Sequence, residues 1–398
     1  MGSLLFCLKV RTLQRIYLDN AATSFPKPEL VYLAMDAYSR RNGTAIGRGS
    51  YRATIEATGI VQRCRKKIAD LLGAEGPDRI VFTFNCTDSL NLALHGLLQP
   101  GDHVITSMVD HNSVQRPLTE MCRKRGIEVT RVGADAVGKI NPLDFKRALC
   151  PRTKLISLIH ASNVTGTIQP VADVGQIARD AGVLLLVDAA QTAGRFPIDL
   201  RQLPIDILAG PGHKGLLGPL GTGFLYLRPG VESRMSSFRQ GGTGTRSEDD
   251  VQPETLPDKY ESGNHNAPGL VGLEAALTWI QARGVPSIQH HEQILVQNML
   301  EGFAKIPGLR VFGPPSDQDR VAVVSVAVEG HEPQQVATIL DQNFGIESRA
   351  GLHCAPGAHR AVGSFELGGT VRLSVGPFST SADVTAAIDA LQQITSHS

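Results

Sequence analysis

The stretch LLLVDAAQTAG, residues 184–194, places the carboxylate of Asp188 directly after a run of aliphatic side chains. Such a short apolar run, bounded by turn residues, is typical of a strand buried on both faces of a parallel sheet. Burying a carboxylate without a partner costs several kcal/mol of free energy. We therefore expect Asp188 to face a cation such as a protonated ring nitrogen. Gln191 follows about one turn later and is predicted to hydrogen-bond a hydroxyl of the same ring.

The same pattern recurs on both sides of this stretch. Short apolar runs alternate with amphipathic stretches from about residue 55 to 230, at 79–84, 103–108, 154–160, 206–210 and 223–227. This alternation predicts an α/β fold with a mainly parallel sheet, in which ligands bind at the carboxyl ends of the strands. A long apolar-periodic helix is expected at 266–284, and beyond it a second, smaller α/β region. Residues 241–259 are either a solvated connector or an active-site loop.

Composition excludes several classes of function. The 398 residues carry 39 Lys and Arg against 38 Asp and Glu, so no strong field marks nucleic acid or a membrane surface as a partner. No apolar stretch approaches the ~20 residues of a membrane-spanning helix. The 6 cysteines form no CxxC pair, which argues against a metal site and a disulfide framework and fits a cytoplasmic protein. Residues 1–14 contain no recognisable motif.

A lysine follows the strand predicted at 206–210. Lys214 stands in the glycine-rich segment 206–223, flanked by glycines and apolar residues. Desolvation there would lower its pKa toward a free amine able to form a Schiff base, although a surface lysine in a loop is the commoner case. Asp188 on the neighbouring strand end favours the first interpretation.

Three further strand ends carry polar residues with two interpretations each. Cys86 and Thr87 are predicted to begin a helix, with Thr87 as the N-cap. The free backbone N–H groups of the first turn of this helix either bind a phosphate or are only capped. His111 either stacks on a flat ring or satisfies a turn. Asn163, in the segment 160–167, either orients a small ligand or builds the turn.

Taken together, these residues describe one ligand. An aspartate and a lysine on neighbouring strand ends, a helix start suited to phosphate and a histidine able to stack all match pyridoxal 5′-phosphate (PLP). The lysine would bind its aldehyde, and the aspartate would keep its ring nitrogen protonated.

Motifs along nearly the whole chain resemble the class V aminotransferase family, and within it the cysteine desulfurases with a selenocysteine-lyase-like branch. They are YLDNAAT (17–23), HASNVTGT (160–167), VDAAQTAG (187–194), GHKGLLGPLGTG (212–223), GGTGTRSE (241–248), YESGNHN (260–266), RAGLHCAP (349–356) and VRLSVGPFST (371–380). The resemblance implies PLP-dependent transferase fold type I. It implies a large domain, 24–280, around a mainly parallel seven-stranded sheet, and a small domain from 1–23 and 281–398. It also implies a homodimer whose site lies between the domains with help from the partner.

The resemblance also implies roles for single residues. Lys214 corresponds to the cofactor-binding lysine, and its companions at the cofactor are Asp188, Gln191, His111, Cys86, Thr87 and His213. Asn163 and Arg372 correspond to the residues that bind the substrate carboxylate, and Arg349 corresponds to a further arginine of the site. Two positions depart from relatives of the SUF type, because Pro211 replaces a serine and Asn264 replaces a threonine of the partner's loop. Each departure affects one phosphate hydrogen bond, although the amide of Asn264 can still donate.

Cys354 alone would be interpreted as a buried packing residue. The resemblance makes it a nucleophile that takes sulfur from L-cysteine as a persulfide and leaves L-alanine. The alternatives are a selenocysteine lyase with the same residues, a carbon–sulfur lyase or aminotransferase that does not use Cys354, and a non-catalytic PLP-binding scaffold. The acceptor protein that collects the sulfur is not identified by the sequence.

Overall fold

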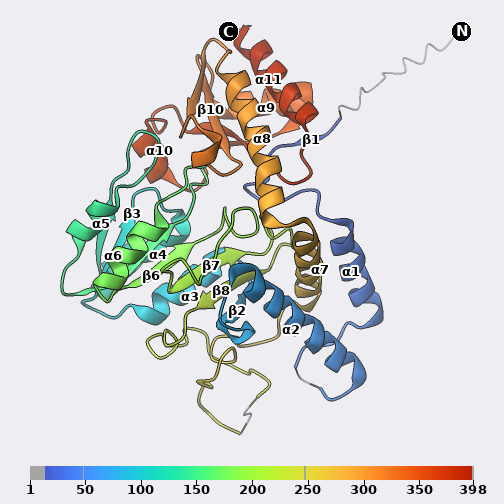
Figure 1. The fold of residues 1–398 in the computed structure, drawn as a ribbon, viewed down its shortest axis with the longest axis vertical. Coiled ribbons are helices and arrows are strands. Elements are labelled where there is room, and N and C mark those ends of the chain that lie inside the picture. Colours follow the sequence, from blue (N-terminus) through green and yellow to red (C-terminus); the bar gives the residue numbers. More distant parts are fainter. Residues whose placement is uncertain (1–13, 48, 246–247, 397–398) are drawn as a thin grey trace, which may run out of the picture.

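A computed structural model describes residues 14–396 except 48 and 246–247 (Figure 1). Its centre is a seven-stranded sheet in the order β2-β8-β7-β6-β5-β3-β4. These strands are β2 (Ile80–Thr83), β3 (His103–Ser107), β4 (Glu128–Val132), β5 (Thr153–Ile159), β6 (Leu184–Asp188), β7 (Ile207–Pro211) and β8 (Gly223–Leu227). All pairs are parallel except those of β8, which runs antiparallel to both β2 and β7. The predicted mainly parallel, seven-stranded sheet is confirmed.

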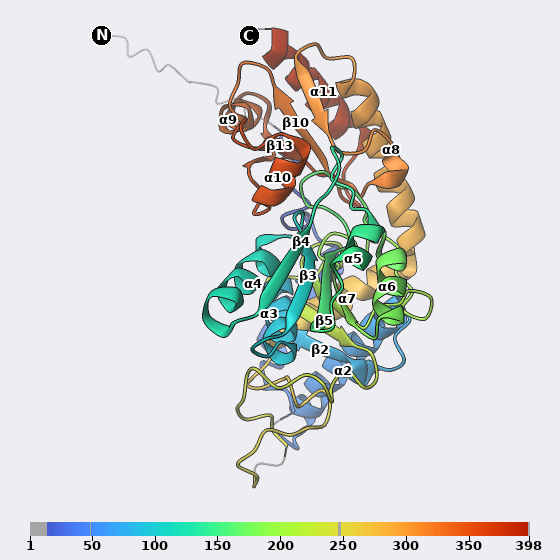
Figure 2. The same ribbon diagram turned by 90° about the vertical axis from the view of Figure 1, so that its left-hand side faces the viewer.

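Successive strand residues face two separate hydrophobic layers. On β6, Leu185 and Val187 join one cluster of buried side chains, while Leu184 and Leu186 join the other. The first cluster is covered by α2 (Arg52–Leu72), α5 (Pro142–Ala148), α6 (Val171–Asp180) and α7 (Ala267–Arg283), and the second by α3 (Cys86–Leu97) and α4 (Asn112–Arg125). Figure 2 shows the sheet between α3 and α4 on one side and α5 and α6 on the other. Because both faces are covered, the inner strands are mostly apolar.

The second sheet lies above the first. It is antiparallel, in the order β12 (Arg349–Gly351), β13 (Thr370–Leu373), β10 (Val324–Val328) and β9 (Leu309–Phe312). The helices around it are α8 (Val285–Phe303), α9 (Pro333–Phe344), α10 (Pro356–Val362) and α11 (Ser381–Ser396). The expected helix at 266–284 is α7, and α8 leads from it to this sheet (Figure 1).

The beginning of the described chain belongs to this second region. β1 (Ile16–Tyr17) pairs in parallel with β11 (Ile346–Glu347), and Leu18 is buried in the core that α8, α9 and α11 form. From there the chain crosses to the large sheet and enters α1 (Glu29–Arg41), which packs against α7. The predicted division at 24–280 agrees with these cores and stays a prediction. None of the described helices combines the length and apolar character that crossing a bilayer requires.

Candidate active site

A cavity at the carboxyl ends of the large sheet collects most of the predicted residues. Its lining includes Cys86, Thr87, His111, Asn163, Asp188, Gln191, Pro211, His213 and Lys214. Arg349, Cys354 and Arg372 come from the second sheet and its loops, on the other side of the boundary between the two regions. The residues predicted at the strand ends of the large sheet thus lie together, because parallel strands end at one edge, and their roles stay predictions.

Asp188 is the last residue of β6, and its side chain is buried. Its Oδ1 accepts hydrogen bonds from the backbone N–H of Ala190 at 2.8 Å and from the thiol of Cys86 at 3.4 Å. Burial, followed by the charge of Asp188, raises the pKa of Cys86 well above its ordinary value, so this thiol stays a neutral donor. Within the described residues Asp188 forms no ion pair, which leaves a buried carboxylate without the cation it requires.

Lys214 follows β7 in a loop that only glycine allows. A Cβ on Gly212 would lie 2.1 Å from Oγ1 of Thr222, and one on Gly215 would lie 2.4 Å from the carbonyl oxygen of Ala193. Burial lowers the pKa of Lys214 against the opposing charge of Asp188, and Arg372 and Arg349 lower it further. Its ammonium group makes no hydrogen bond to any residue that the structure describes. Lys214 is therefore a partly desolvated amine with no resident partner.

The loop before Lys214 is held by the segment that crosses from the second region. The carbonyl oxygen of His213 accepts hydrogen bonds from Oγ1 of Thr23 at 3.0 Å and from the backbone N–H of Ser24 at 3.0 Å. Lys27 reaches the same oxygen at 3.5 Å. The His213 ring has a pKa lowered to about 4 by burial and by the charges of Lys214 and Lys27, and its buried Nδ1 has no partner. Sequence reasoning assigned no role to residues 19–27, although the motif YLDNAAT covers their beginning.

The helix start at Thr87 differs from the prediction. The N-cap of α3 is Asn85, not Thr87, and its side chain accepts from the backbone N–H of Asp88 at 2.9 Å. Asn85 has the extended backbone of a cap, which lets its short side chain reach back to the first turn. The Thr87 hydroxyl lies inside the first turn and contacts Oγ of Ser113 at 2.7 Å.

His111 caps the next helix. Its Nδ1 accepts from the backbone N–H of Ser113 at 3.1 Å at the beginning of α4. Burial lowers the pKa of His111 to about 4, with smaller contributions from the charges of Lys214 and Arg349. The imidazole is therefore neutral near pH 7 and occupies a turn position. Stacking on a bound ring stays a prediction.

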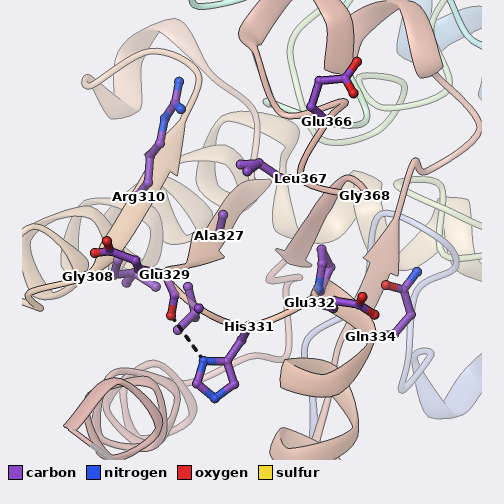
Figure 3. A pocket seen from close by; sticks show the side chains of 14 residues that line it. Gly308, Arg310, Ala327, Glu329, His331, Glu332, Gln334, Glu366, Leu367 and Gly368 are labelled. Atoms are coloured by element: carbon purple, nitrogen blue, oxygen red, sulfur yellow. Dashed lines mark hydrogen bonds between the residues drawn. The ribbon is translucent and has the colours of Figure 1, made fainter. Parts of the chain in front are cut away.

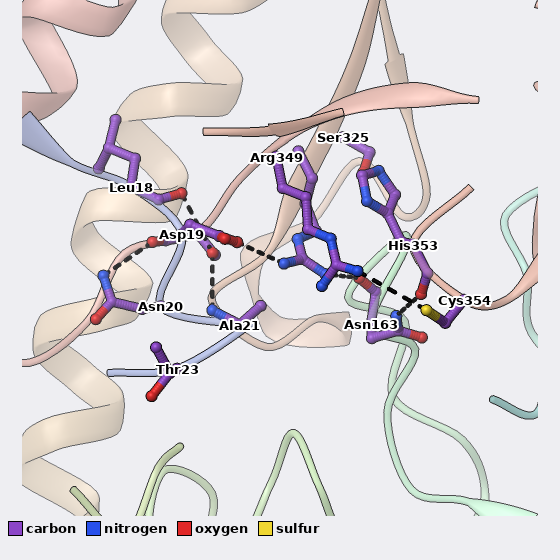
Figure 4. A network of polar contacts seen from close by, with 12 residues as sticks. Leu18, Asp19, Asn20, Ala21, Thr23, Asn163, Ser325, Arg349, His353 and Cys354 are labelled. Carbon is purple, nitrogen blue, oxygen red and sulfur yellow. Dashed lines mark hydrogen bonds and ion pairs between the residues drawn. The ribbon is translucent and has the colours of Figure 1, made fainter. Parts of the chain in front are cut away.

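A polar network joins the two regions (Figure 4). The guanidinium of Arg372, on β13, donates through Nη2 to Oδ1 of Asp19 at 2.5 Å and through Nη1 to the backbone oxygen of Asn163 at 3.1 Å. The Arg372 side chain is buried, and its Nε has no partner. Gln191 donates to the carbonyl of Ala21 at 3.1 Å, and its Oε1 is buried without a partner.

Cys354 lies on a strained turn at the edge of this network. The turn is closed by the N–H of Ala355 and the carbonyl of Leu352 at 2.9 Å. Its two central residues, His353 at φ 46° and Cys354 at φ 59°, are both left-handed although neither is glycine. Left-handed backbone costs roughly 1–2 kcal/mol for each such residue, so surrounding contacts must hold it.

The Cys354 side chain is exposed, which excludes the packing interpretation. Nη2 of Arg349 lies 3.8 Å from its sulfur. His353 faces the opposite way, buried, with Nε2 at 3.0 Å from Oγ1 of Thr370. Of Arg349 and His353, only Arg349 reaches the thiol.

Asn264, predicted to bind the cofactor, does not line the cavity. It is exposed and lines a separate shallow pocket with Arg239 and His265. Beside it, Glu261 forms a buried ion pair with Arg65 at 2.6 Å, which anchors the segment 260–266. The sequence comparison with SUF-type relatives expected Asn264 to act in a partner's site, and its position within one chain is compatible with that expectation.

A larger cavity lies elsewhere, in the second region (Figure 3). Its volume is about 910 Å³, and it is lined by Glu329, Glu332 and Glu366 with Arg310. It contains neither an amine suited to a carbonyl group nor a cysteine, so size does not identify the reactive site here. Among the described residues, no three His, Cys, Asp or Glu side chains are arranged to hold a metal ion.

Comparisons with known proteins agree with this geometry. A protein of Methanothermobacter thermautotrophicus named probable cysteine desulfurase is 37% identical over 383 residues, covering 95% of this chain and 94% of that protein. A probable cysteine desulfurase of Synechocystis is 33% identical, with 95% and 90% covered. The apo structure of a cysteine desulfurase from Thermococcus onnurineus superposes with a TM-score of 0.89 at 32% identity, covering 100% of both chains. The cysteine desulfurase CsdA of Escherichia coli superposes with a TM-score of 0.86 at 30% identity, covering 96% of this chain and 95% of that one.

These likenesses confirm the predicted fold type and agree with the predicted activity. The sequence pattern described as aminotransferase class-V matches residues 16–387, which is nearly the whole chain. The chain therefore belongs to the aminotransferase class-V family.

Proposed function

We propose that the protein is a PLP-dependent cysteine desulfurase that converts L-cysteine to L-alanine and takes the sulfur onto Cys354 as a persulfide. The observation that carries the proposal is that an amine and a thiol both lie at the boundary between the large sheet and the second region. A partly desolvated amine, Lys214, lies in a cavity with the unpaired carboxylate of Asp188. The exposed thiol of Cys354 lies on a turn that is hydrogen-bonded to Asn163, a residue that lines the same cavity. The names of the relatives support the same activity.

The residues around the cavity fit PLP. Asp188 lacks a cation, which the protonated ring nitrogen supplies, and Gln191 has a free buried Oε1 for the ring hydroxyl. The N–H groups at the start of α3 and the unpartnered Nδ1 of His213 face the same cavity and suit a phosphate. Pro211 ends β7 and has no N–H to offer, so phosphate binding rests on these other groups and on Asn264 of a partner subunit. When bound, PLP withdraws electrons from the amino acid and makes its Cα proton acidic.

The chain's own residues then supply binding, proton transfer and the nucleophile. Arg372 and Asn163 bind the substrate carboxylate, which orients the Cα–H bond. Lys214, with its lowered pKa, accepts the Cα proton at Nζ. The Cys354 thiolate forms a bond to the substrate sulfur while the carbon–sulfur bond breaks. The electron pair of that bond stays with the carbon skeleton, which takes up protons and leaves as alanine.

A homodimer completes the proposal. Large apolar side chains of α1 and the start of α2 are exposed, namely Leu30, Leu33, Tyr51 and Ile55. We propose that a second copy covers this face and that the segment 260–266 of each copy acts at the neighbouring site. The proposal places the enzyme in the reducing cytoplasm, which keeps the Cys354 thiol free. Sedimentation should give a dimer, and Leu33→Arg should give a monomer if this face is the interface.

The deciding experiment incubates the purified holoenzyme with L-cysteine and a reductant. Alanine and sulfide should appear in equal amounts. L-selenocysteine run side by side decides between a desulfurase and a selenocysteine lyase. Formation of a keto acid without sulfide would favour an aminotransferase that does not use Cys354, and absence of any product would leave only the scaffold.

A further inference from the structure

The strained turn of Cys354 is held from the large sheet by two hydrogen bonds to its central carbonyl groups. Nδ2 of Asn163 donates to the carbonyl oxygen of His353 at 2.7 Å, and the backbone N–H of Asn112 donates to that of Cys354 at 2.8 Å. Asn112 begins α4, and Asn163 follows β5. No glycine favours the left-handed backbone here, so these contacts are needed to keep the turn in place.

The two hydrogen-bond donors that anchor the turn, Asn163 and Asn112, differ in whether a bound ligand can compete for them. The Asn112 donor is a backbone group at the beginning of a helix, fixed by the helix itself. The Asn163 donor is a side-chain amide that lines the cavity of Lys214 and Asp188. Its Oδ1 is buried without a partner, and its backbone oxygen is bonded to Nη1 of Arg372. Of the two anchors, only Asn163 can exchange its partner when a ligand enters the cavity.

We propose that Asn163 is a positioning residue for Cys354, coupling a carboxylate in the cavity to the placement of the thiol. The inference rests on the proposed function, in which Asn163 and Arg372 bind the substrate carboxylate. A hydrogen bond to a carboxylate is about twice as strong as one to a neutral carbonyl. The arriving carboxylate therefore takes the Nδ2 donor, the carbonyl of His353 loses its partner, and the turn releases Cys354 toward the substrate sulfur.

The remaining contacts of the turn define its range of movement. His353 stays fixed to Thr370 through its buried ring. Gly357 approaches the backbone of Met108 so closely that a Cβ there would lie 2.0 Å from its carbonyl oxygen. Between these two fixed points, the Asn112 bond still holds the carbonyl of Cys354 and Ala355 is buried in the first core, so the peptide unit that joins His353 to Cys354 is what moves once the Asn163 contact opens. The movement is local and does not require the two sheets to separate.

The experiment measures alkylation of Cys354 by iodoacetamide in the holoenzyme, followed by mass spectrometry of the peptide that contains it. L-Alanine carries the carboxylate and has no sulfur to react, whereas L-alaninamide lacks the carboxylate. We expect L-alanine to raise the alkylation rate about fivefold, the factor that one hydrogen bond of average strength represents, and L-alaninamide to leave it unchanged. Asn163→Asp, which has no donor, should alkylate at the raised rate without ligand and show no response.

Asn141→Asp is the matched control, because Asn141 is exposed and only caps α5. It should respond to L-alanine as the wild type does. Equal rates in wild type and Asn163→Asp, or an L-alanine response that survives in Asn163→Asp, overturn the coupling. Asn163→Ser serves as a second variant if Asn163→Asp does not fold. The readout requires no turnover, so a wild type that makes no alanine from L-cysteine refutes the proposed function alone.

Discussion

Asp19 and Arg372 form an ion pair with 2.5 Å between Oδ1 and Nη2, although 353 residues separate them in the sequence. The Arg372 side chain is 1% exposed and that of Asp19 20% exposed. A buried guanidinium without its carboxylate would carry an uncompensated charge. The pair therefore fixes the arginine that donates to the backbone of Asn163, a residue of the cavity, and ties the beginning of the described chain to β13.

Asp19→Asn should separate stability from affinity. The change removes the charge that compensates Arg372, and we expect the free energy of unfolding to fall by about 2 kcal/mol, less than for a fully buried pair because Asp19 is partly exposed. The KM for L-cysteine should decrease, because Arg372 no longer shares its charge with Asp19. Urea unfolding and steady-state kinetics measure the two effects. Asp36→Asn, whose pair with Arg40 is exposed, should leave both unchanged.

Cys354→Ala should abolish sulfide release while keeping the cofactor. Removing a covalent nucleophile lowers turnover by at least about 10³-fold, whereas Cys354 is not among the residues that line the PLP cavity. Sulfide release and the visible absorption of bound PLP measure the two properties on one sample. Cys122→Ala, an exposed cysteine on α4, should behave as the wild type. Normal sulfide release by Cys354→Ala would refute the persulfide role.

Lys214→Ala should prevent covalent attachment of the cofactor. Borohydride reduction of the wild type fixes PLP to the amine, so the protein mass should increase by one reduced cofactor, and the variant should show no increase. Lys154→Ala is the control, because Lys154 is an exposed lysine on β5. A reduced adduct on Lys214→Ala would mean that another amine holds the cofactor.

Stability should fall as the pH is lowered from about 6.5 to 4. His160 is buried with its Nδ1 unpartnered, and burial lowers its pKa to about 4. Because the unfolded chain takes up its proton near pH 6.5 and the folded chain does not, the free energy of unfolding decreases through this window. We expect His160 alone to account for about 2 kcal/mol between pH 7 and pH 5. Urea unfolding of His160→Leu should show a correspondingly smaller pH dependence, and an unchanged slope would contradict this assignment.

The large sheet was predictable because most of its strands are uninterrupted apolar runs. β4 escaped prediction, since its sequence EVTRV lies at the sheet edge and only Val132 is buried, so it forms no apolar run. The antiparallel direction of β8 also escaped, although only residues 212–222 separate it from β7 and leave no room for a crossover helix.

The residues of the candidate site also fall into two groups, those that a local sequence pattern indicates and those that it does not. The placement of Asp188 and Lys214 was predictable because Asp188 ends one buried strand and Lys214 follows the neighbouring one, and parallel strands end at one edge. Thr87 was wrongly expected as the cap, because a sequence offers Asn85 and Thr87 with similar capping ability. Asp19 and Asn112 were missed, since their contacts depend on segments distant in the chain whose approach no local pattern indicates.

Because Asp19 and Arg372 are far apart in the sequence, the ribosome adds them to the chain at different times. At about 10 residues per second, a ribosome that has made Asp19 needs on the order of half a minute to make Arg372, 353 residues later. During that time Lys214 and its loop emerge and fold without the arginine that β13 contributes. A nascent chain therefore contains Lys214 well before Arg372, so under the proposed function the lysine that would bind PLP is made before the arginine that would bind the substrate carboxylate.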